Sequence, residues 1–595
     1  MSVILSRRDL DFLLFEWLDT ANLLQHKPFQ EHTPETVASV LDLAERLATD
    51  RFAPHNRAND LQEPSFDGER VHVLPEVGFA LRAFADAGFV AAPLPESAGG
   101  MQVPASVFNA ALAWFHGANA GTGAYALLTF AAANLLVHHA DSPIRDRFVP
   151  PMLDGRFFGT MALSEPQAGS SLADISTRAE PAPDGTWRLF GRKMWISGGD
   201  HELAENIVHL VLARTPGAPE GTKGISLFVV PKLLVGEDGS VGERNDVVLA
   251  GINHKMGYRG TVNTAPVFGD GAHTPGGQPG AIGYLVGVEG GGLPVMFTMM
   301  NEARIGVGVG ATALAYTGFL KSLAYARDRL QGRQAGSPAS APQVPLVEHP
   351  DIRRMLLAQK AYAEGALALV LYASRLVDDI AAHPESAAES EALLGLLTPI
   401  VKSWPSQWGP IANDLAIQVL GGAGYTRDHD IEQHYRDNRL NPIHEGTHGI
   451  QALDLLGRKV LLDGGAGLGL LAGRMADTIE RARAGDATTQ GYADALETAL
   501  FRLQETTRIL AAQANPREAL ADATLYLEAL GHLVVAWLWL EQSLAAGDGA
   551  GDFYAGKRAA TRYFFLRELP KVGPMLDILD TFDRLTLDLD PATLG

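Results

Sequence analysis

The residues best placed to do chemistry lie in one short stretch, Asn441–Gln451, with the sequence NPIHEGTHGIQ. His444, Glu445 and His448 form the pattern H-E-x-x-H, which on a helix places two imidazoles on one face for zinc, with the glutamate as general base. Gly446 inside such a helix would cost about 1 kcal/mol relative to alanine, and no third ligand follows at a familiar spacing. The alternative is a carboxylate on a glycine-containing bend, from which Glu445 could act as a base inside a pocket.

The composition of the chain limits the classes of function. With 595 residues the chain is too long for one hydrophobic core, so we expect several packed units. The net charge of -21 opposes general binding to nucleic acid. The absence of cysteine excludes disulfides, thiolate nucleophiles and cysteine-based metal sites.

We expect neither a secretory signal nor a membrane partner. The N-terminus lacks the long apolar core of a signal peptide. The closest approach to a membrane span is Gly292–Leu320, which contains Glu302 and Arg304, so we expect no uncharged apolar run of about 20 residues. These features favour a cytoplasmic protein.

Hydrophobic periodicity divides the chain into five segments and predicts an α+β protein. Runs rich in β-branched and aromatic residues predict a middle β domain, a small barrel or sandwich. The helical patterns after it are each long enough to cross a four-helix bundle. In order, the predicted segments are an N-terminal helical arm (residues 1–34), an N-terminal helical domain (35–158), the middle β domain (159–280), a C-terminal four-helix bundle (281–462) and an extra C-terminal helical domain (463–595).

Within these segments the periodicity also predicts individual elements. The expected strands lie at residues 187–190, 207–212, 225–230 and 262–268. The expected helices lie at residues 35–50, 105–116, 121–139, 295–330, 350–383, 392–421 and 443–462. The stretch 331–345 is rich in Gly, Ser and Pro and predicts an exposed loop, and the glycines of 463–469 predict a linker.

Six short motifs follow one another along the chain, and together they carry a resemblance to the acyl-CoA dehydrogenase family. The resemblance covers residues 35–460, and the two terminal segments are similar to an extended bacterial branch that includes 3-(methylthio)propanoyl-CoA dehydrogenase. The motifs are Met161–Ser170 (MALSEPQAGS), Gly191–Ser197 (GRKMWIS), Ala303–Gly306 (ARIG), Gln418–Tyr425 (QVLGGAGY), Arg436–Asp437 and Glu445–Thr447 (EGT).

The resemblance implies an FAD enzyme that removes two hydrogens from an acyl-CoA thioester. It makes Glu445 the base that takes the α-proton, while a hydride leaves the β-carbon towards flavin N5. The apolar acyl chain should raise the pKa of Glu445 by excluding water, which makes it a stronger base. By the same resemblance, the Glu445 N–H and a flavin hydroxyl hold the developing enolate oxygen.

The resemblance also assigns the residues that bind FAD and substrate. For the flavin ring and the loop near the pyrophosphate it implies Met161, Leu163, Ser164, Gly169, Ser170, Trp195 and Ser197. For contacts with the rest of FAD, partly across subunits of a homodimer, it implies Arg329, Gln418, Gly422 and Thr447. For the substrate it implies Ser170, Arg304 and Gly446.

Some features depart from the family or leave alternatives open. Pro350 stands where the family has a glutamine, and a long loop follows Arg329, so the sequence departs from the family pattern at the contacts to the adenosine and pyrophosphate. The expected acceptor is electron-transfer flavoprotein, and the favoured substrates are short or heteroatom-containing acyl-CoA thioesters such as 3-(methylthio)propanoyl-CoA. The alternatives are a flavoprotein of the same fold that acts as an acyl-CoA oxidase or a DNA-associated alkylation-response protein, and a zinc hydrolase.

Overall fold

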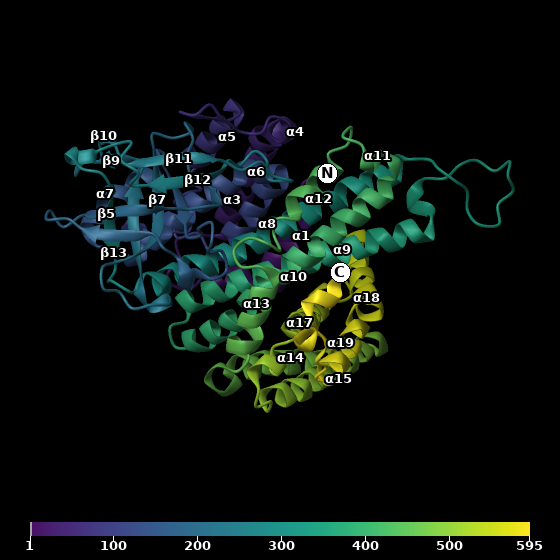
Figure 1. Cartoon of the computed structure of the whole chain (residues 1–595). Helices are drawn as coiled ribbons and strands as arrows, with labels where there is room; N and C mark the ends of the chain where they lie inside the picture. The colour runs from purple at the N-terminus through teal and green to yellow at the C-terminus, as the bar shows by residue number, and fades with distance from the viewer. Residues whose placement is uncertain (1–2) are drawn as a thin grey trace. The chain divides into compact units, whose positions relative to one another are not determined.

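The structure is a computed structural model that describes residues 3–595, and for residues 298–301 and 463 it describes the backbone alone (Figure 1). The chain folds into two compact units, one built around a β-sheet and one built of helices. The sheet unit comprises Ser39–Pro104 and Trp114–Gly306, and the bundle unit comprises Met1–Ala38, Ala105–Ala113 and Val307–Gly595.

The sheet unit has a nine-stranded mixed sheet with the strand order β11-β12-β5-β13-β8-β7-β3, in which β4 pairs with β5 and β7, and β6 pairs with β12. Strands β3 and β7 are parallel, whereas β7 and β8 are antiparallel. The strands are β3 (Phe157–Ala162), β4 (Arg178–Pro181), β5 (Trp187–Arg192), β6 (Ile196–Ser197), β7 (Asn206–Arg214), β8 (Ile225–Pro231), β11 (Val247–Ile252), β12 (Asn263–Phe268) and β13 (Ala281–Val286). Two short pairs, β1 (Ser65–Phe66) with β2 (Val71–His72) and β9 (Leu233–Val235) with β10 (Val241–Arg244), stand apart from it.

Alternating side chains of the central strands explain why this sheet is buried on both faces. Along β7, Val208, Leu210 and Leu212 enter one hydrophobic core, and Val211 and Ala213 enter another. Because successive side chains of a strand point to opposite faces, an unbroken apolar run fills two cores at once. The first core also contains residues of the nearby helices, including Phe148 and Met152.

The helices before the sheet are α3 (Pro34–Leu47), α4 (Asn56–Leu61), α5 (Pro75–Asp86), α6 (Ala105–His139) and α7 (Ser142–Leu153). Those after it are α8 (Gly292–Asp328), α9 (Pro350–Ala382), α10 (Ala387–Leu420), α11 (Gly422–Tyr425), α12 (Ile431–Asn438) and α13 (His448–Asp454). The C-terminal segment adds α14 (Ala466–Arg483), α15 (Ala487–Ala511), α16 (Pro516–Ala519), α17 (Ala523–Ala546), α18 (Asp552–Arg567), α19 (Val572–Leu579) and α20 (Leu585–Asp588). The N-terminal arm holds α1 (Arg7–Asp11) and α2 (Thr20–Leu23). The predicted order of helices, sheet and helices is confirmed.

A buried lysine ties both ends of the chain to the bundle. The Lys557 ammonium on α18 pairs with Asp9 of the N-terminal arm and, at 3.0 Å, with Glu364 of α9. It also donates to the Gln542 side chain of α17 at 2.9 Å. All three charged side chains are buried, so their opposite charges stabilise one another, and Glu364 also pairs with Lys360 of α9. The N-terminal arm and the C-terminal segment are thus integral parts of the bundle unit.

The expectation of no uncharged apolar run was wrong for α6. This helix of 35 residues contains no Asp, Glu, Lys or Arg, and it continues through Asn119, whose non-helical backbone kinks it where two helices were predicted. By length and composition α6, α8 and α17 could each cross a membrane, and their most apolar windows are 72%, 94% and 83% buried inside the protein. Burial of that extent is also what core helices show.

Two predicted boundaries shifted. The helix expected from residue 443 begins only at His448, because Glu445 and Gly446 have positive φ values of +53° and +85° that no α-helix accommodates. The linker expected at residues 463–469 is shorter, since α14 already begins at Ala466.

Candidate active site

Glu445 lies on a strained bend directly before α13. Its φ of +53° is in the left-handed region that residues other than glycine rarely adopt, and Gly446 follows at +85°. Thr447 caps α13, since its side chain accepts a hydrogen bond from the Ile450 N–H at 3.3 Å. Strain of this kind persists only where the surroundings enforce it, and it gathers at functional sites.

A buried lysine enforces the bend. The Lys402 ammonium, on α10, donates to the carbonyl oxygens of Asn441 at 2.7 Å and of Gly446 at 2.8 Å. The Lys402 side chain is fully buried. From the other side, the Gln451 amide donates to the Glu445 carbonyl at 3.0 Å. A Cβ on Gly446 would lie 2.5 Å from the nitrogen of that amide, so this position requires glycine.

A chain of buried asparagines supports the same loop. Asn441 donates to the Asn438 side chain, and Asn438 donates to the Asn413 side chain, both at 2.8 Å. Asn413 in turn donates to the Leu314 carbonyl of α8 at 2.9 Å. Buried polar chains with satisfied partners hold a single geometry. No motif pointed to Lys402 or these asparagines; the one available signal was a lysine within a long apolar pattern.

The zinc arrangement does not form. His444 bonds to the Asn441 side chain at 3.1 Å, whereas His448, the first residue of α13, lies 3.7 Å from the Glu528 carboxylate of α17. The two imidazoles therefore do not share one helical face, which the zinc pattern requires. Among the side chains that the structure describes, no three His, Asp or Glu residues are placed to hold a metal ion.

A cavity of about 510 Å³ lies beside the loop within the bundle unit. Its walls combine apolar and polar side chains, as small-molecule sites do. They include Pro442, Ile443, Thr447 and His448, together with Tyr435 of α12 and Asp414 of α10.

In the sheet unit, the end of β3 and the segment before β6 lie against each other. The Met194 N–H donates to the Ser164 carbonyl at 3.0 Å. Ser197, on β6, accepts a hydrogen bond from the Asn263 side chain of β12 at 3.3 Å. The predicted flavin-ring residues Met161, Leu163, Ser164, Trp195 and Ser197 therefore belong to one part of the sheet unit.

Trp195 combines a strained backbone with an exposed aromatic side chain. Its φ is +65°, and the residue is 63% exposed. A large aromatic surface at a strained residue gains little from water, whereas stacking against a flat ring system would bury it. The residues present fit FAD in this respect.

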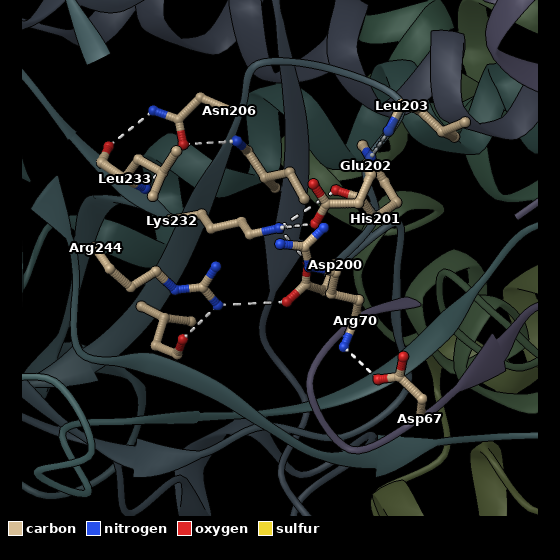
Figure 2. Close-up of polar contacts among 12 residues, drawn as sticks. Asp67, Arg70, Asp200, His201, Glu202, Leu203, Asn206, Lys232, Leu233 and Arg244 are labelled. Atoms are coloured by element: carbon tan, nitrogen blue, oxygen red, sulfur yellow. Dashed lines mark hydrogen bonds and ion pairs between the residues drawn. The ribbon is translucent and has the colours of Figure 1, made fainter. Parts of the chain in front are cut away.

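A cluster of charged residues anchors the segment that follows Ser197 (Figure 2). The Lys232 ammonium contacts Asp200 at 2.5 Å and Glu202 at 3.2 Å, and Arg244 reaches Asp200 at 3.5 Å. Nearby, Asn206 donates to the Leu233 carbonyl at 2.8 Å. These contacts fix the course of the chain between β6 and β7.

The other predicted residues are mostly exposed. Gly169 and Ser170 lie on an exposed bend, and nothing lies within 4 Å of a Cβ placed on Gly169. Arg304 is buried on α8. In the bundle unit, the exposed residues are Arg329 after α8, Gln418 in the last turn of α10, Gly422 at the start of α11, and Thr447. Glu445 and the flavin-ring residues belong to different units, so their meeting stays a prediction.

Comparison with protein families finds matches along almost the whole chain. The matching descriptions are "Acyl-CoA dehydrogenase, N-terminal domain" for residues 34–156, "middle domain" for 160–270 and "C-terminal domain" for 290–461. Residues 471–590 match "Acetyl-CoA dehydrogenase C-terminal like".

Individual proteins agree with these matches. 3-Methylmercaptopropionyl-CoA dehydrogenase of Ruegeria pomeroyi is 38% identical over 91% of this chain and 92% of its own length. The broad-specificity linear acyl-CoA dehydrogenase FadE5 of Mycobacterium tuberculosis is 34% identical over 98% of both chains. Among solved structures, Caenorhabditis elegans ACDH-11 in complex with C11-CoA has a TM-score of 0.78 at 20% identity, and covers 96% of this chain and 94% of its own. A Bacillus anthracis acyl-CoA dehydrogenase complexed with FAD has a TM-score of 0.74 at 19% identity, over 98% and 95%.

Proposed function

The chain belongs to the acyl-CoA dehydrogenase family, and from this premise we propose that Glu445 is the base of an FAD-dependent dehydrogenation of a short or heteroatom-containing acyl-CoA thioester. The family fixes the reaction class, an FAD-dependent removal of two hydrogens from an acyl-CoA. The observation that supports Glu445 as the base is its bend, which Lys402 and Gln451 hold from two sides.

Glu445 performs the proton transfer in this scheme. Its carboxylate takes the α-proton of the thioester, and the product is the 2-enoyl-CoA. FAD, when bound, supplies the acceptor for the hydride of the β-carbon. The Glu445 N–H donates to the thioester oxygen, where negative charge develops. The nearby Lys402 ammonium adds positive charge to the loop, so it favours the same development of charge.

The proposed substrate class is that of 3-(methylthio)propanoyl-CoA. Its support is the similarity to the R. pomeroyi protein, which extends over 91% of the chain. FadE5, with similar identity, is described as acting on linear acyl-CoA thioesters, so linear short chains are the next candidates.

The proposed oligomeric state, electron acceptor and cellular location follow from the family and from the exposed residues. The exposed Arg329, Gln418 and Gly422 support a homodimer in which each subunit completes the FAD site of the other. Electron-transfer flavoprotein is the proposed acceptor, and the cytoplasm is the proposed location. The net charge of -21 supports an enzyme without a nucleic-acid partner.

A panel of acyl-CoA thioesters tests the substrate proposal. The holoenzyme is assayed with a dye acceptor against 3-(methylthio)propanoyl-CoA, linear chains of increasing length and phenylacyl-CoA. The proposal predicts the highest kcat/KM for the first or for short linear chains, and a maximum at long or aromatic chains contradicts it. Peroxide formation at a rate matching dye reduction would favour the oxidase, and a gel shift of duplex DNA without turnover would favour the DNA-associated protein.

A further inference from the structure

The carboxylate of Glu165, directly after Ser164, is the most heavily bonded one near the flavin-ring residues. One oxygen accepts from the Thr177 N–H at 3.0 Å, the Thr177 hydroxyl at 2.6 Å and the Lys193 ammonium at 3.0 Å. The other accepts at 2.7 Å from the Gln167 amide and from the N–H and hydroxyl of Ser176. An ionised carboxylate offers about four acceptor sites, so these donors saturate it.

Lys193 connects this carboxylate to two backbone segments. Its side chain is fully buried, and its ammonium also donates to the Leu163 carbonyl at 2.9 Å. Its own N–H donates to the Pro266 carbonyl of β12 at 2.9 Å. The next residue, Met194, donates to the Ser164 carbonyl. The end of β3 and the approach to Trp195 are therefore joined by one side chain and one backbone bond.

Both members of the pair are charged at neutral pH. Burial opposes ionisation of Glu165, but the Lys193 charge and the hydrogen bonds of Thr177 and Ser176 hold its pKa down to about 2. Burial lowers the pKa of Lys193 to about 8, and the facing carboxylate limits that fall.

The Glu165–Lys193 pair bears on the position of the exposed Trp195. The backbone of Trp195, held at a φ of +65°, sets where this exposed side chain leaves the chain. Lys193 lies two residues before it and determines where that backbone runs. The same ammonium fixes the Leu163 carbonyl, next to Ser164.

We propose that Glu165 and Lys193 are positioning residues that hold the Leu163–Ser164 and Trp195–Ser197 segments in one arrangement against the flavin ring. The proposal rests on the FAD-dependent function given above. The pair touches neither substrate nor reacting atoms, and it acts through the backbone of the residues that do.

The test compares Lys193→Met with a structural control in the same unit. Asp246→Asn is the control, because Asp246 is equally buried and accepts from the N–H groups of Gly271 and Gly280, remote in sequence from both segments. Each protein is measured for thermal stability, FAD dissociation constant, visible circular dichroism of the bound flavin, and kcat and KM. Misplacement of catalytic groups by about 1 Å can cost on the order of 100-fold in rate.

The expected result is that Lys193→Met weakens FAD binding, changes the flavin dichroism and lowers kcat by about 10- to 100-fold, while Asp246→Asn loses only stability. Equal flavin properties in wild type and Lys193→Met would overturn the proposal. If Lys193→Met does not fold, the test uses Thr177→Val, which removes the hydroxyl donor to Glu165 and keeps the ion pair. A smaller change in the same flavin signals is then expected. No change in those signals overturns the inference. Wild type is titrated in parallel, and its failure to bind FAD would instead refute the proposed function.

Discussion

Gly446→Ala is the sharpest perturbation of the bend that carries Glu445. Alanine must adopt the φ of +85°, and its Cβ must displace the Gln451 amide, which would lie 2.5 Å away. That amide donates to the Glu445 carbonyl at 3.0 Å, so its displacement breaks a hydrogen bond that holds Glu445 in place. The substitution leaves the Glu445 carboxylate itself unchanged.

The size of the effect follows from these two costs. The left-handed conformation costs alanine about 1–2 kcal/mol, and the lost hydrogen bond costs about 1 kcal/mol. Together they amount to about 2–3 kcal/mol, which lowers kcat about 30- to 150-fold if the bend must keep its geometry in the transition state.

The assay is steady-state turnover with a dye acceptor, with flavin content and thermal melting measured on the same samples. Gly491→Ala is the control, because Gly491 is an exposed residue of α15 with nothing within 4 Å of an added Cβ. If the collision is the cause, Gly446→Ala costs less in a Gln451→Ala background, with a coupling energy of about 1 kcal/mol. Wild-type kcat in Gly446→Ala would refute the reasoning.

Three further predictions concern buried charges. Lys402→Met should lower kcat more than Gly446→Ala, because it removes two hydrogen bonds worth about 1.5–3 kcal/mol each; turnover kinetics measure this, and unchanged kcat contradicts it. Lys557→Met should lower the free energy of unfolding by about 3–5 kcal/mol in urea titrations, because it leaves the buried Asp9 without its cation and Glu364 with Lys360 alone; an unchanged midpoint contradicts it. The folded-state pKa of Glu165, about 2, lies below its ordinary value of 4.5, so its stabilisation is present above pH 4.5 and is lost as the pH falls through 2. The stability difference between wild type and Glu165→Gln should therefore shrink over that range, and a difference that grows on acidification contradicts it.

Much of the fold could be predicted because two periodicities dominate the sequence. The run 207–212 predicted a buried strand, and β7 occupies Asn206–Arg214 with its side chains in two cores. Two helices were predicted where the structure has the single kinked helix α6, because the backbone of Asn119 leaves the helical dihedrals without ending the helix. Helix propensity alone does not distinguish a kink within one helix from a break between two helices.

The candidate site was predictable only where a motif marks it. Glu445 and Trp195 stand in recognisable motifs, whereas Lys402 acts from α10 on a loop about 40 residues later, through carbonyl oxygens that leave no trace in the sequence. Glu165 and Lys193 stand inside motifs, but their pairing depends on register in the sheet unit. Such contacts are properties of tertiary packing and not of local pattern.

The most direct measurement is α-proton exchange and turnover in Glu445→Gln, with FAD content determined on the same protein. If Glu445 is the base, this variant remains yellow with bound FAD, fails to exchange the α-proton of an acyl-CoA in deuterated water, and loses dehydrogenation by at least about 100-fold. Exchange and turnover at the wild-type rate would contradict the assignment of Glu445 as the base.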